Sequence, residues 1–330
     1  MKKSEAQRND TPLMQGAYWG LDYLKRNAGI LIALLVLTVF LTVATENFAT
    51  PSNLLTVLRQ ICTNALLAFG MTFVLIIGGI DLTVGSVLGA CGVSVVMLIE
   101  SGVPIAGAVI LSLLLGAVLG LINGCIIAFT GMPPFIVTLS MMEVIRGFAY
   151  IITDGRSVSC TNESFNAFGN SYFLGIPVPV YIVFFAMALC SVILYRTKFG
   201  RRMYAVGGNV NAARFTGINT KSITIRAYVI SAVLSALAGI VLASRMYSGQ
   251  PTAGDGYESD AIAAAVLGGT SFNGGIGTLS GTLFGALVIG ILNNGLNQLR
   301  VTSYMQMVIK GIVIILAVGI DIFKNRRRAK

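Results

Sequence analysis

Residues 195–226 read YRTKFGRRMYAVGGNVNAARFTGINTKSITIR and lie between two apolar segments of membrane-spanning length. The window contains many lysines and arginines and no aspartate or glutamate. Short loops dense in basic residues stay on the cytoplasmic side of a membrane, because moving cations across the bilayer is disfavoured. The basic residues are Arg196, Lys198, Arg201, Arg202, Arg214, Lys221 and Arg226. The window therefore predicts a cytoplasmic loop and sets the orientation of the helices on both sides of it.

The composition is typical of a membrane protein. Hydrophobic residues make up 55% of the 330 residues and charged residues 11%, with a mean hydropathy of +0.82 and 38 glycines. Such values favour a helical protein that crosses the membrane several times, with glycines that allow close helix packing. Most of the 23 basic residues lie in segments 1–28, 196–226 and 324–330. The net charge of +10 therefore reports topology, and we expect no nucleic-acid partner.

Several chemistries are excluded by the residues that the sequence lacks. Histidine is absent, which rules out His-containing catalytic triads and zinc sites. The sequence contains no Walker A pattern, so an ATPase that drives this chain would have to be another polypeptide. The five cysteines have neither disulfide nor zinc spacing and are interpreted mainly as small hydrophobic residues. We expect no catalytic residue, no metal and no cofactor on this chain, which is not an enzyme by itself.

Apolar segments of spanning length indicate the path through the membrane. They lie at about 28–45, 61–80, 84–100, 105–129, 135–152, 178–195, 223–244, 279–299 and 304–322. The first is interpreted as an uncleaved helix rather than a secretory signal, because no clear cleavage site follows it. These nine segments alone would leave the basic C-terminus outside the cell, because the number of crossings would be odd. A tenth crossing, by a short or broken helix at 258–268, is predicted to return the C-terminus to the cytoplasm.

The fold class predicted is therefore an all-α polytopic membrane protein with about ten transmembrane helices and both termini in the cytoplasm. Residues 1–27 form a cytoplasmic N-terminal segment and residues 28–323 the transmembrane domain, which contains the cytoplasmic loop 196–226. Residues 324–330 form a basic cytoplasmic tail.

Two parts of the chain resemble each other. The segment TLSMMEVIRGFAYII (138–152) aligns with TSYMQMVIKGIVIIL (302–316), which matches Arg146 with Lys310. Upstream of each segment lie a Gly-Gly turn that opens a helix, at 78–89 and 268–281, and an Asn-Gly pair at Asn123 and Asn294. The matched helices enter the membrane from opposite sides in the threading above. The chain is therefore predicted to contain two inverted repeats, a plan common in transport proteins, although apolar helices also match by chance.

Polar side chains inside the apolar segments are candidates for a solute path. Amides can hydrogen-bond hydroxyl groups without the cost of burying a charge. The candidates are Asn64, Asn123, Asn293, Asn294 and Asn297. Hydrogen bonding between helices is the alternative role for each of them. Among the charges, Glu143 and Arg146 are spaced to form an ion pair on one helix, and Asp81 and Lys310 are interpreted as lying near the membrane boundaries.

Inside the basic loop, the sequence predicts a short helix. Asn209 is a suitable N-cap, residues 210–215 follow it, and Gly217 suits a left-handed C-cap. Such an element can lie along the membrane surface and insert into a groove on a partner. A solvated loop without a partner is the alternative, and it would not need the capping pattern.

With these residues in view, the chain resembles the permease subunits of bacterial ABC importers for monosaccharides. The resemblance covers nearly the whole chain after residue 28. Its most specific parts are NALLAFGMTFVLIIGGIDLTVGSVLG (64–89), GRRMYAVGGNVNAARFTGIN (200–219), QPTAGDGYESDAIAAAVLGGTSFNGGIGTLSGTLFGALVIGILNNGLN (250–297) and SYMQMVIKG (303–311).

The resemblance implies a multi-pass permease of the bacterial inner membrane, surrounded by lipid, that moves ribose or a similar sugar by alternating access. It implies three protein partners: a second copy of the chain, a cytoplasmic ATP-binding cassette subunit that binds ATP and Mg, and a periplasmic sugar-binding protein. It makes 28–323 the permease domain and 196–226 the coupling loop. The residues that would couple to the ATPase are Gly207, Gly208, Asn209, Ala212, Ala213, Arg214, Gly217, Ile218 and Asn219.

A stand-alone secondary carrier is the rival interpretation. It would use Asp81, Glu143 or Lys310 for ion coupling, and inverted repeats would fit it equally well. A passive channel fits poorly, because the sequence contains neither a ring of charges nor a recognisable filter motif.

Overall fold

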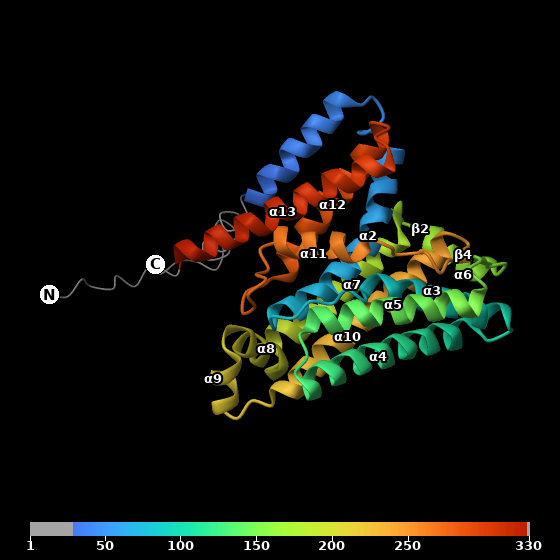
Figure 1. Ribbon diagram of the computed structural model, residues 1–330. Coiled ribbons are helices and arrows are strands. Elements are labelled where there is room, and N and C mark those ends of the chain that lie inside the picture. The colour runs from blue at the N-terminus through green and yellow to red at the C-terminus, as the bar shows by residue number, and fades with distance from the viewer. Residues whose placement is uncertain (1–28, 329–330) are drawn as a thin grey trace, which may run out of the picture.

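The structure is a computed structural model that describes residues 29–328, so the predicted N-terminal segment 1–27 lies outside the described residues. The described chain is almost entirely helical (Figure 1). A first helix, Gly29–Ala44, precedes those that Figure 1 labels. The others are α2 (Pro51–Ile76), α3 (Val84–Glu100), α4 (Ile105–Thr130), α5 (Pro134–Thr153), α6 (Glu163–Asn170), α7 (Val178–Ser191) with its π-helical continuation η1 (Val192–Arg196), α8 (Lys198–Gly208), α9 (Val210–Phe215), α10 (Thr220–Arg245), α11 (Tyr257–Leu267), α12 (Leu279–Gln298) and α13 (Ser303–Arg328). α7 and η1 together make one spanning segment.

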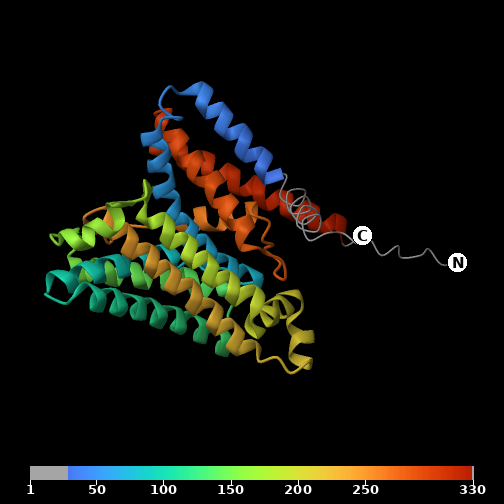
Figure 2. The same cartoon turned by 180° about the vertical axis from the view of Figure 1, so that it is seen from behind.

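The strands are short and lie at one end of the molecule. They are β1 (Val158–Ser159), β2 (Tyr172–Phe173), β3 (Ile176–Pro177) and β4 (Ser248–Gly249). β1 pairs with β4 and β2 pairs with β3, both antiparallel. The strands and α6 lie at the opposite end of the molecule from α8 and α9 (Figures 1 and 2).

Local sequence signals explain where several helices begin and end. The Thr50 hydroxyl accepts a hydrogen bond from the Asn53 amide and Pro51 follows at the first position, so α2 begins well before the predicted residue 61. Gly131 ends α4 in the left-handed conformation, and Pro134 opens α5. Every apolar segment predicted from the sequence overlaps a helix of the structure, as does the short segment 258–268. α13 continues to Arg328, so the basic tail begins inside that helix.

α2 connects two groups of helices. The first group is α3, α4, α5 and α10, in which α10 packs against α3 and α4. The second group is α11, α12 and α13, in which α11 contacts both other helices. α2 packs against α10 on one side and against α11 and α12 on the other. α2 and α10 are accordingly well buried, whereas α4, α5 and α7 expose most of their apolar surface.

The packing partners in the two groups follow one scheme. α3 contacts α4 and α5, and α11 contacts α12 and α13 in the same order. α4 packs against α10, while α12 packs against α2. The Asn-Gly pairs fall on α4 and α12 and the matched segments on α5 and α13, which are corresponding positions. The two Gly-Gly turns do not correspond. The first precedes α3, whose counterpart is α11, whereas the second precedes α12, whose counterpart is α4. That part of the predicted repeat is wrong.

Six of the described helices are long and apolar enough to cross a membrane. Their outward faces carry large apolar side chains, including Phe129, Phe148 and Phe185. An apolar surface of this extent is expected to face lipid.

Candidate functional site

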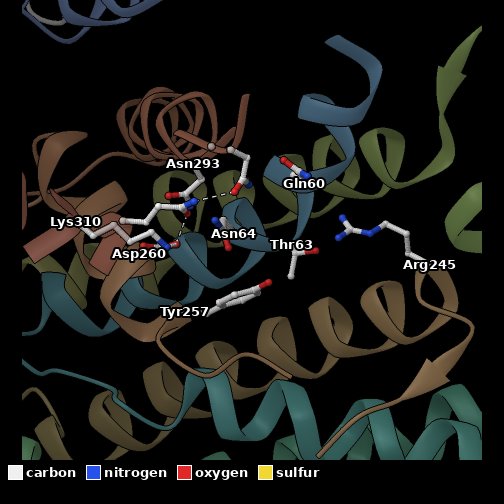
Figure 3. Close-up of a pocket in the computed structure, with 11 residues that line it drawn as sticks. Gln60, Thr63, Asn64, Arg245, Tyr257, Asp260, Asn293 and Lys310 are labelled. Carbon is white, nitrogen blue, oxygen red and sulfur yellow. Dashed lines mark hydrogen bonds and ion pairs between the residues drawn. The ribbon is translucent and has the colours of Figure 1, made fainter. Parts of the chain in front are cut away.

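A polar cavity of about 210 Å³ lies between α2 and the second helix group (Figure 3). α2 supplies Gln60, Thr63 and Asn64, and α10 supplies its last residue, Arg245. The remaining lining comes from Tyr257 and Asp260 on α11, from Gly290, Asn293 and Asn297 on α12, and from Gln306 and Lys310 on α13. A cavity lined by hydrogen-bonding side chains inside a bundle of apolar helices is suited to a small polar solute.

The charged centre of the cavity is an ion pair between two helices. The Lys310 ammonium on α13 lies 3.0 Å from Oδ2 of Asp260 on α11. The Asn293 amide on α12 donates to the same oxygen, also at 3.0 Å. The side chain of Asp260 is only 3% exposed and that of Lys310 is 29% exposed. The pair therefore joins three helices at a point where its cation still reaches the cavity.

Two polar residues of α2 border the cavity without a side-chain hydrogen bond to another described residue. Thr63 is 3% exposed, and its hydroxyl has no hydrogen-bond partner among the described residues. Asn64 is 7% exposed, and its amide makes no side-chain hydrogen bond within residues 29–328. Buried polar groups are nearly always hydrogen-bonded, to protein or to water. These groups are therefore available to water or to a ligand.

The structure separates the asparagines that the sequence suggested for a solute path. Asn64, Asn293 and Asn297 line the cavity. Asn294 instead exchanges hydrogen bonds with Asn53 of α2, at 3.0 and 3.1 Å. Asn123 is fully buried and donates to the Thr83 hydroxyl. The last two join helices away from the cavity.

Two expectations about charged residues need correction. Glu143 is exposed and does not pair with Arg146, whose guanidinium donates to the carbonyls of Pro251 and Ala253 at 2.6 and 2.7 Å. The reason is that Arg146 extends across α3 to the loop before α11, where two backbone acceptors are available. Lys310 is not an isolated interfacial charge but the partner of Asp260.

Asp81 lies in the interior of the protein and is held there by hydrogen bonds. It is 1% exposed, in the turn between α2 and α3. One carboxylate oxygen accepts from the amide and hydroxyl of Thr83, and the other accepts from the Ser231 hydroxyl on α10 at 2.8 Å. The residue ties the turn to α10.

At the opposite end, α8 and α9 form the candidate coupling surface. The predicted short helix is present as α9, and the Asn209 side chain accepts from the Ala212 amide at 2.9 Å. Gly217 has a φ of +78°, and its amide bonds the Arg214 carbonyl, so both predicted caps are confirmed. Ala213 is buried, and Ile218 packs against the core. Asn219 caps α10 through the Ser222 amide.

The adjacent glycines of α8 have different surroundings. A Cβ atom on Gly207 would overlap the Ile76 carbonyl oxygen, whereas one on Gly208 would meet nothing within 4 Å. Beside this contact, the Gly275 amide donates to the Ile76 carbonyl at 2.8 Å. Tyr204 donates to the Gly277 carbonyl. α8 is therefore joined to the end of α2 and to the loop before α12 mainly through backbone.

Sequence reasoning missed several residues of both surfaces. It did not predict α8, which continues through Gly207 and Gly208. It also passed over Phe215, which ends α9 and is 92% exposed. A large aromatic residue inside a basic loop was the available signal. Nothing local indicates that Arg245, Asp260 and Lys310 line one cavity, because they lie on separate helices.

Long apolar helices that enclose a polar cavity, with a basic pair of helices at one end, define a polytopic membrane protein of the permease class. A comparison of sequences supplies the family. The chain belongs to the family described as "Branched-chain amino acid transport system / permease component", which matches residues 53–318.

Curated relatives match over nearly the full length. The ribose import permease protein of Bacillus subtilis is 48% identical over 302 residues, which are 91% of this chain and 94% of the relative. The D-allose transport system permease protein of Escherichia coli is 38% identical over 291 residues, 88% of this chain and 89% of the relative. The L-arabinose transport system permease protein of the same organism is 38% identical over 300 residues, 91% and 92% of the two chains. No solved structure shows a significant match.

Proposed function

We propose that the chain is the membrane-spanning subunit of an ATP-driven importer that carries a monosaccharide, ribose or a similar sugar, across the bacterial inner membrane. The family description names branched-chain amino acids, but the curated relatives that match nearly the whole chain are named for ribose, allose and arabinose. A cavity lined by amides, hydroxyls, one ion pair and the Arg245 guanidinium also suits hydroxyl groups better than it suits an aliphatic side chain.

The capped helix α9 is the observation that carries the ATP-driven part of the proposal. It presents the exposed Phe215 among exposed basic side chains, including Arg202 and Arg214, on a rigid base of backbone contacts. An aromatic residue with a basic rim is suited to insertion into a groove with acidic borders on a partner. We assign this partner as the cytoplasmic ATP-binding cassette subunit, which would bind ATP and Mg.

The proposed topology has about ten crossings, with both termini and the α8–α9 end in the cytoplasm. α11 has 11 residues and therefore extends only about 16 Å, which is short of a bilayer core of about 30 Å. Because α11 is surrounded by α2, α3, α12 and α13, its ends need not meet lipid. The repeated packing scheme supports two inverted repeats, α2 to α5 and α10 to α13, in which each helix has a counterpart.

Glu143 supports the proposal of a homodimer. It is exposed on α5, and Val144 and Phe148 on the same helix are exposed as well. A carboxylate that faces lipid in the middle of a spanning helix is disfavoured by a few kcal/mol. A second copy of the chain that covers this face would remove the carboxylate from lipid.

In the proposed mechanism, nucleotide binding closes the cassette dimer, and α8 and α9 move with it. The free energy comes from the different affinities of nucleotide for the two states of the complex. A separate periplasmic binding protein would deliver the sugar at the other end, and alternating access would then expose the cavity to each side in turn.

Co-purification with the cassette subunit of the same transport system tests the proposal. Phe215→Asp is expected to remove cassette binding and ATP-dependent uptake, while membrane insertion is preserved. Phe173→Asp, the same change at the strand end, serves as the control for cassette binding and membrane insertion, because Phe173 is also exposed but lies away from α8 and α9 (Figure 1). Retention of cassette binding by the Phe215 variant would contradict the assignment of α9.

An ion-coupled secondary carrier is the alternative function, and the Lys310–Asp260 pair in the cavity is the observation that favours it. Asp81 is a weaker candidate for ion coupling, because hydroxyl and amide donors already satisfy both of its oxygens. Uptake that stops with an uncoupler while ATP is held constant would favour the carrier.

A further inference from the structure

Asp260, Asn293 and Lys310 form a cluster in the cavity in which several hydrogen-bonding atoms have no described partner. Both donors to Asp260, from Lys310 and Asn293, bond to Oδ2, and Oδ1 accepts no hydrogen bond from residues 29–328. The Asn293 carbonyl oxygen is also buried and without a partner among the described residues. The Lys310 ammonium has three N–H donors, and the structure uses one of them. The cluster therefore offers two acceptors and a cationic donor.

α2 adds further open groups to the same cavity. The Thr63 hydroxyl and the Asn64 amide border it, and Figure 3 shows Asn64 between Thr63 and the Asp260 group. A hydroxyl and an amide each donate and accept. Nearly complete burial with unmet hydrogen-bonding capacity is unusual for a structural residue. The open atoms on α2, α11 and α12 thus share one polar space.

The arrangement selects a class of ligand. A neutral molecule with neighbouring hydroxyl groups can donate to the two acceptors and accept from Lys310 at the same time. An anionic group at this cluster would meet the acceptors of Asp260 and Asn293, although the cavity also holds the cation of Arg245. An aliphatic solute would leave every group unpaired. The volume of about 210 Å³ is below the usual range for drug-sized sites, so one sugar ring suits it better than two.

We propose that Asp260, Asn293 and Lys310 form a hydroxyl-recognition cluster that binds a neutral, single-ring polyhydroxylated solute during transport. This inference rests on the proposed function and adds the residues that contact the solute. The carboxylate and the Asn293 carbonyl accept from neighbouring hydroxyls, and the Lys310 ammonium donates to a hydroxyl oxygen.

The test uses the complete transporter in proteoliposomes, with the ATPase and binding protein of the same system. The solute is whichever of D-ribose, L-arabinose and D-allose the native complex transports, and uptake and ATP hydrolysis are measured on one preparation. Asp260→Asn is expected to lower the sugar moved per ATP hydrolysed by about ten-fold or more, as expected for a lost hydrogen bond to a charged group. Asp255→Asn, the same change at an exposed carboxylate, should have no effect.

Two further variants separate solute recognition from helix packing. A charge exchange, Asp260→Lys with Lys310→Asp, retains an ion pair. Compared with either single substitution, the double variant is expected to regain thermal stability without regaining transport. Asn293→Leu keeps the Asp260–Lys310 pair and removes an unpaired buried oxygen, so the complex should assemble while transport per ATP falls. Asn293→Leu also provides the test if the Asp260 variants fail to assemble.

The outcomes distinguish this inference from the proposed function. Native transport per ATP in Asn293→Leu, or full recovery of transport in the charge exchange, would overturn the recognition cluster and leave the importer intact. A native chain that binds no cassette subunit and takes up no sugar with ATP would instead refute the proposed function.

Discussion

The chain buries two aspartates, Asp81 and Asp260, in different ways. Asp81, 1% exposed, has hydroxyl and backbone donors on both oxygens and no cation beside it. Asp260, 2% exposed, has a cation and an amide on one oxygen, while the other oxygen bonds no described residue. Asp260 borders a cavity and Asp81 does not border that cavity.

The difference teaches how to separate a structural carboxylate from one that is available to a ligand. At Asp81, hydrogen-bond donors from Thr83 and from Ser231 on α10 satisfy both carboxylate oxygens, and the carboxylate holds the turn between α2 and α3 in place. A carboxylate with one open oxygen beside a cavity retains hydrogen-bonding capacity after folding. Burial alone, which is nearly equal for the two residues, does not distinguish them.

The largest effect is expected from Asp81→Ala. The change leaves the Thr83 amide, the Thr83 hydroxyl and the Ser231 hydroxyl without their acceptor, which should lower the stability by roughly 3–5 kcal/mol. The midpoint of thermal unfolding in detergent is the measurement. Asp255→Ala, at an exposed aspartate, is the control and should leave the midpoint unchanged. Equal unfolding midpoints for Asp81→Ala and Asp255→Ala would contradict the structural role of Asp81.

Gly207→Ala should have the next largest effect and extends the comparison to the turn that holds Asp81. The new methyl group would overlap the Ile76 carbonyl, a backbone atom that cannot rotate away, at a cost of roughly 2–3 kcal/mol. Gly208→Ala is the matched control, because nothing lies within 4 Å of its Cβ position. Both unfolding midpoint and cassette co-purification are measured. The idea fails if the two alanine variants behave alike.

A smaller loss of stability is expected for Lys310→Met. Asp260 loses its cation but keeps the Asn293 amide and gains access to cavity water, so the loss should be roughly 1–2 kcal/mol. Lys310→Arg keeps the charge and should recover most of the stability. A loss as large as that of Asp81→Ala would show that Asp260 is also mainly structural.

Thr63→Val is expected to have the smallest effect on stability, and in the opposite direction. It replaces a buried hydroxyl that has no hydrogen-bond partner among the described residues with a methyl group of similar shape, so stability should stay the same or rise by up to about 1 kcal/mol. Thr72→Val is the comparison, because the Thr72 hydroxyl bonds Thr282 at 2.7 Å and its loss should lower the midpoint. A large destabilisation by Thr63→Val would show that the hydroxyl serves packing.

Local features of the fold followed from the sequence. Hydropathy located the long helices, and the capping residues Asn209 and Gly217 bounded α9, because these signals act within a few residues. The early start of α2 was not predicted, although an N-cap residue, Thr50, and a proline at the first helical position, Pro51, indicate it. The continuation of α8 through Gly207 was missed because a tertiary contact, rather than helix propensity, selects glycine there.

The candidate site was less predictable. The asparagines were chosen by residue type, which does not distinguish Asn293 in the cavity from its neighbour Asn294 between helices. One residue along a helix is about 100° of rotation, so the two point in different directions. The Asp260–Lys310 pair joins helices that are distant in sequence, and only the packing of α11 and α13 brings them together.

The contact between Gly207 and Ile76 has a consequence for the transmission of motion. Side chains change rotamer on picosecond to nanosecond timescales and can absorb small displacements of a neighbouring helix. Where backbone meets backbone, as it does at Gly207, Ile76 and Gly275, there is no rotamer to absorb them. A displacement of α8 would therefore reach the end of α2 and the loop before α12 with little loss of amplitude.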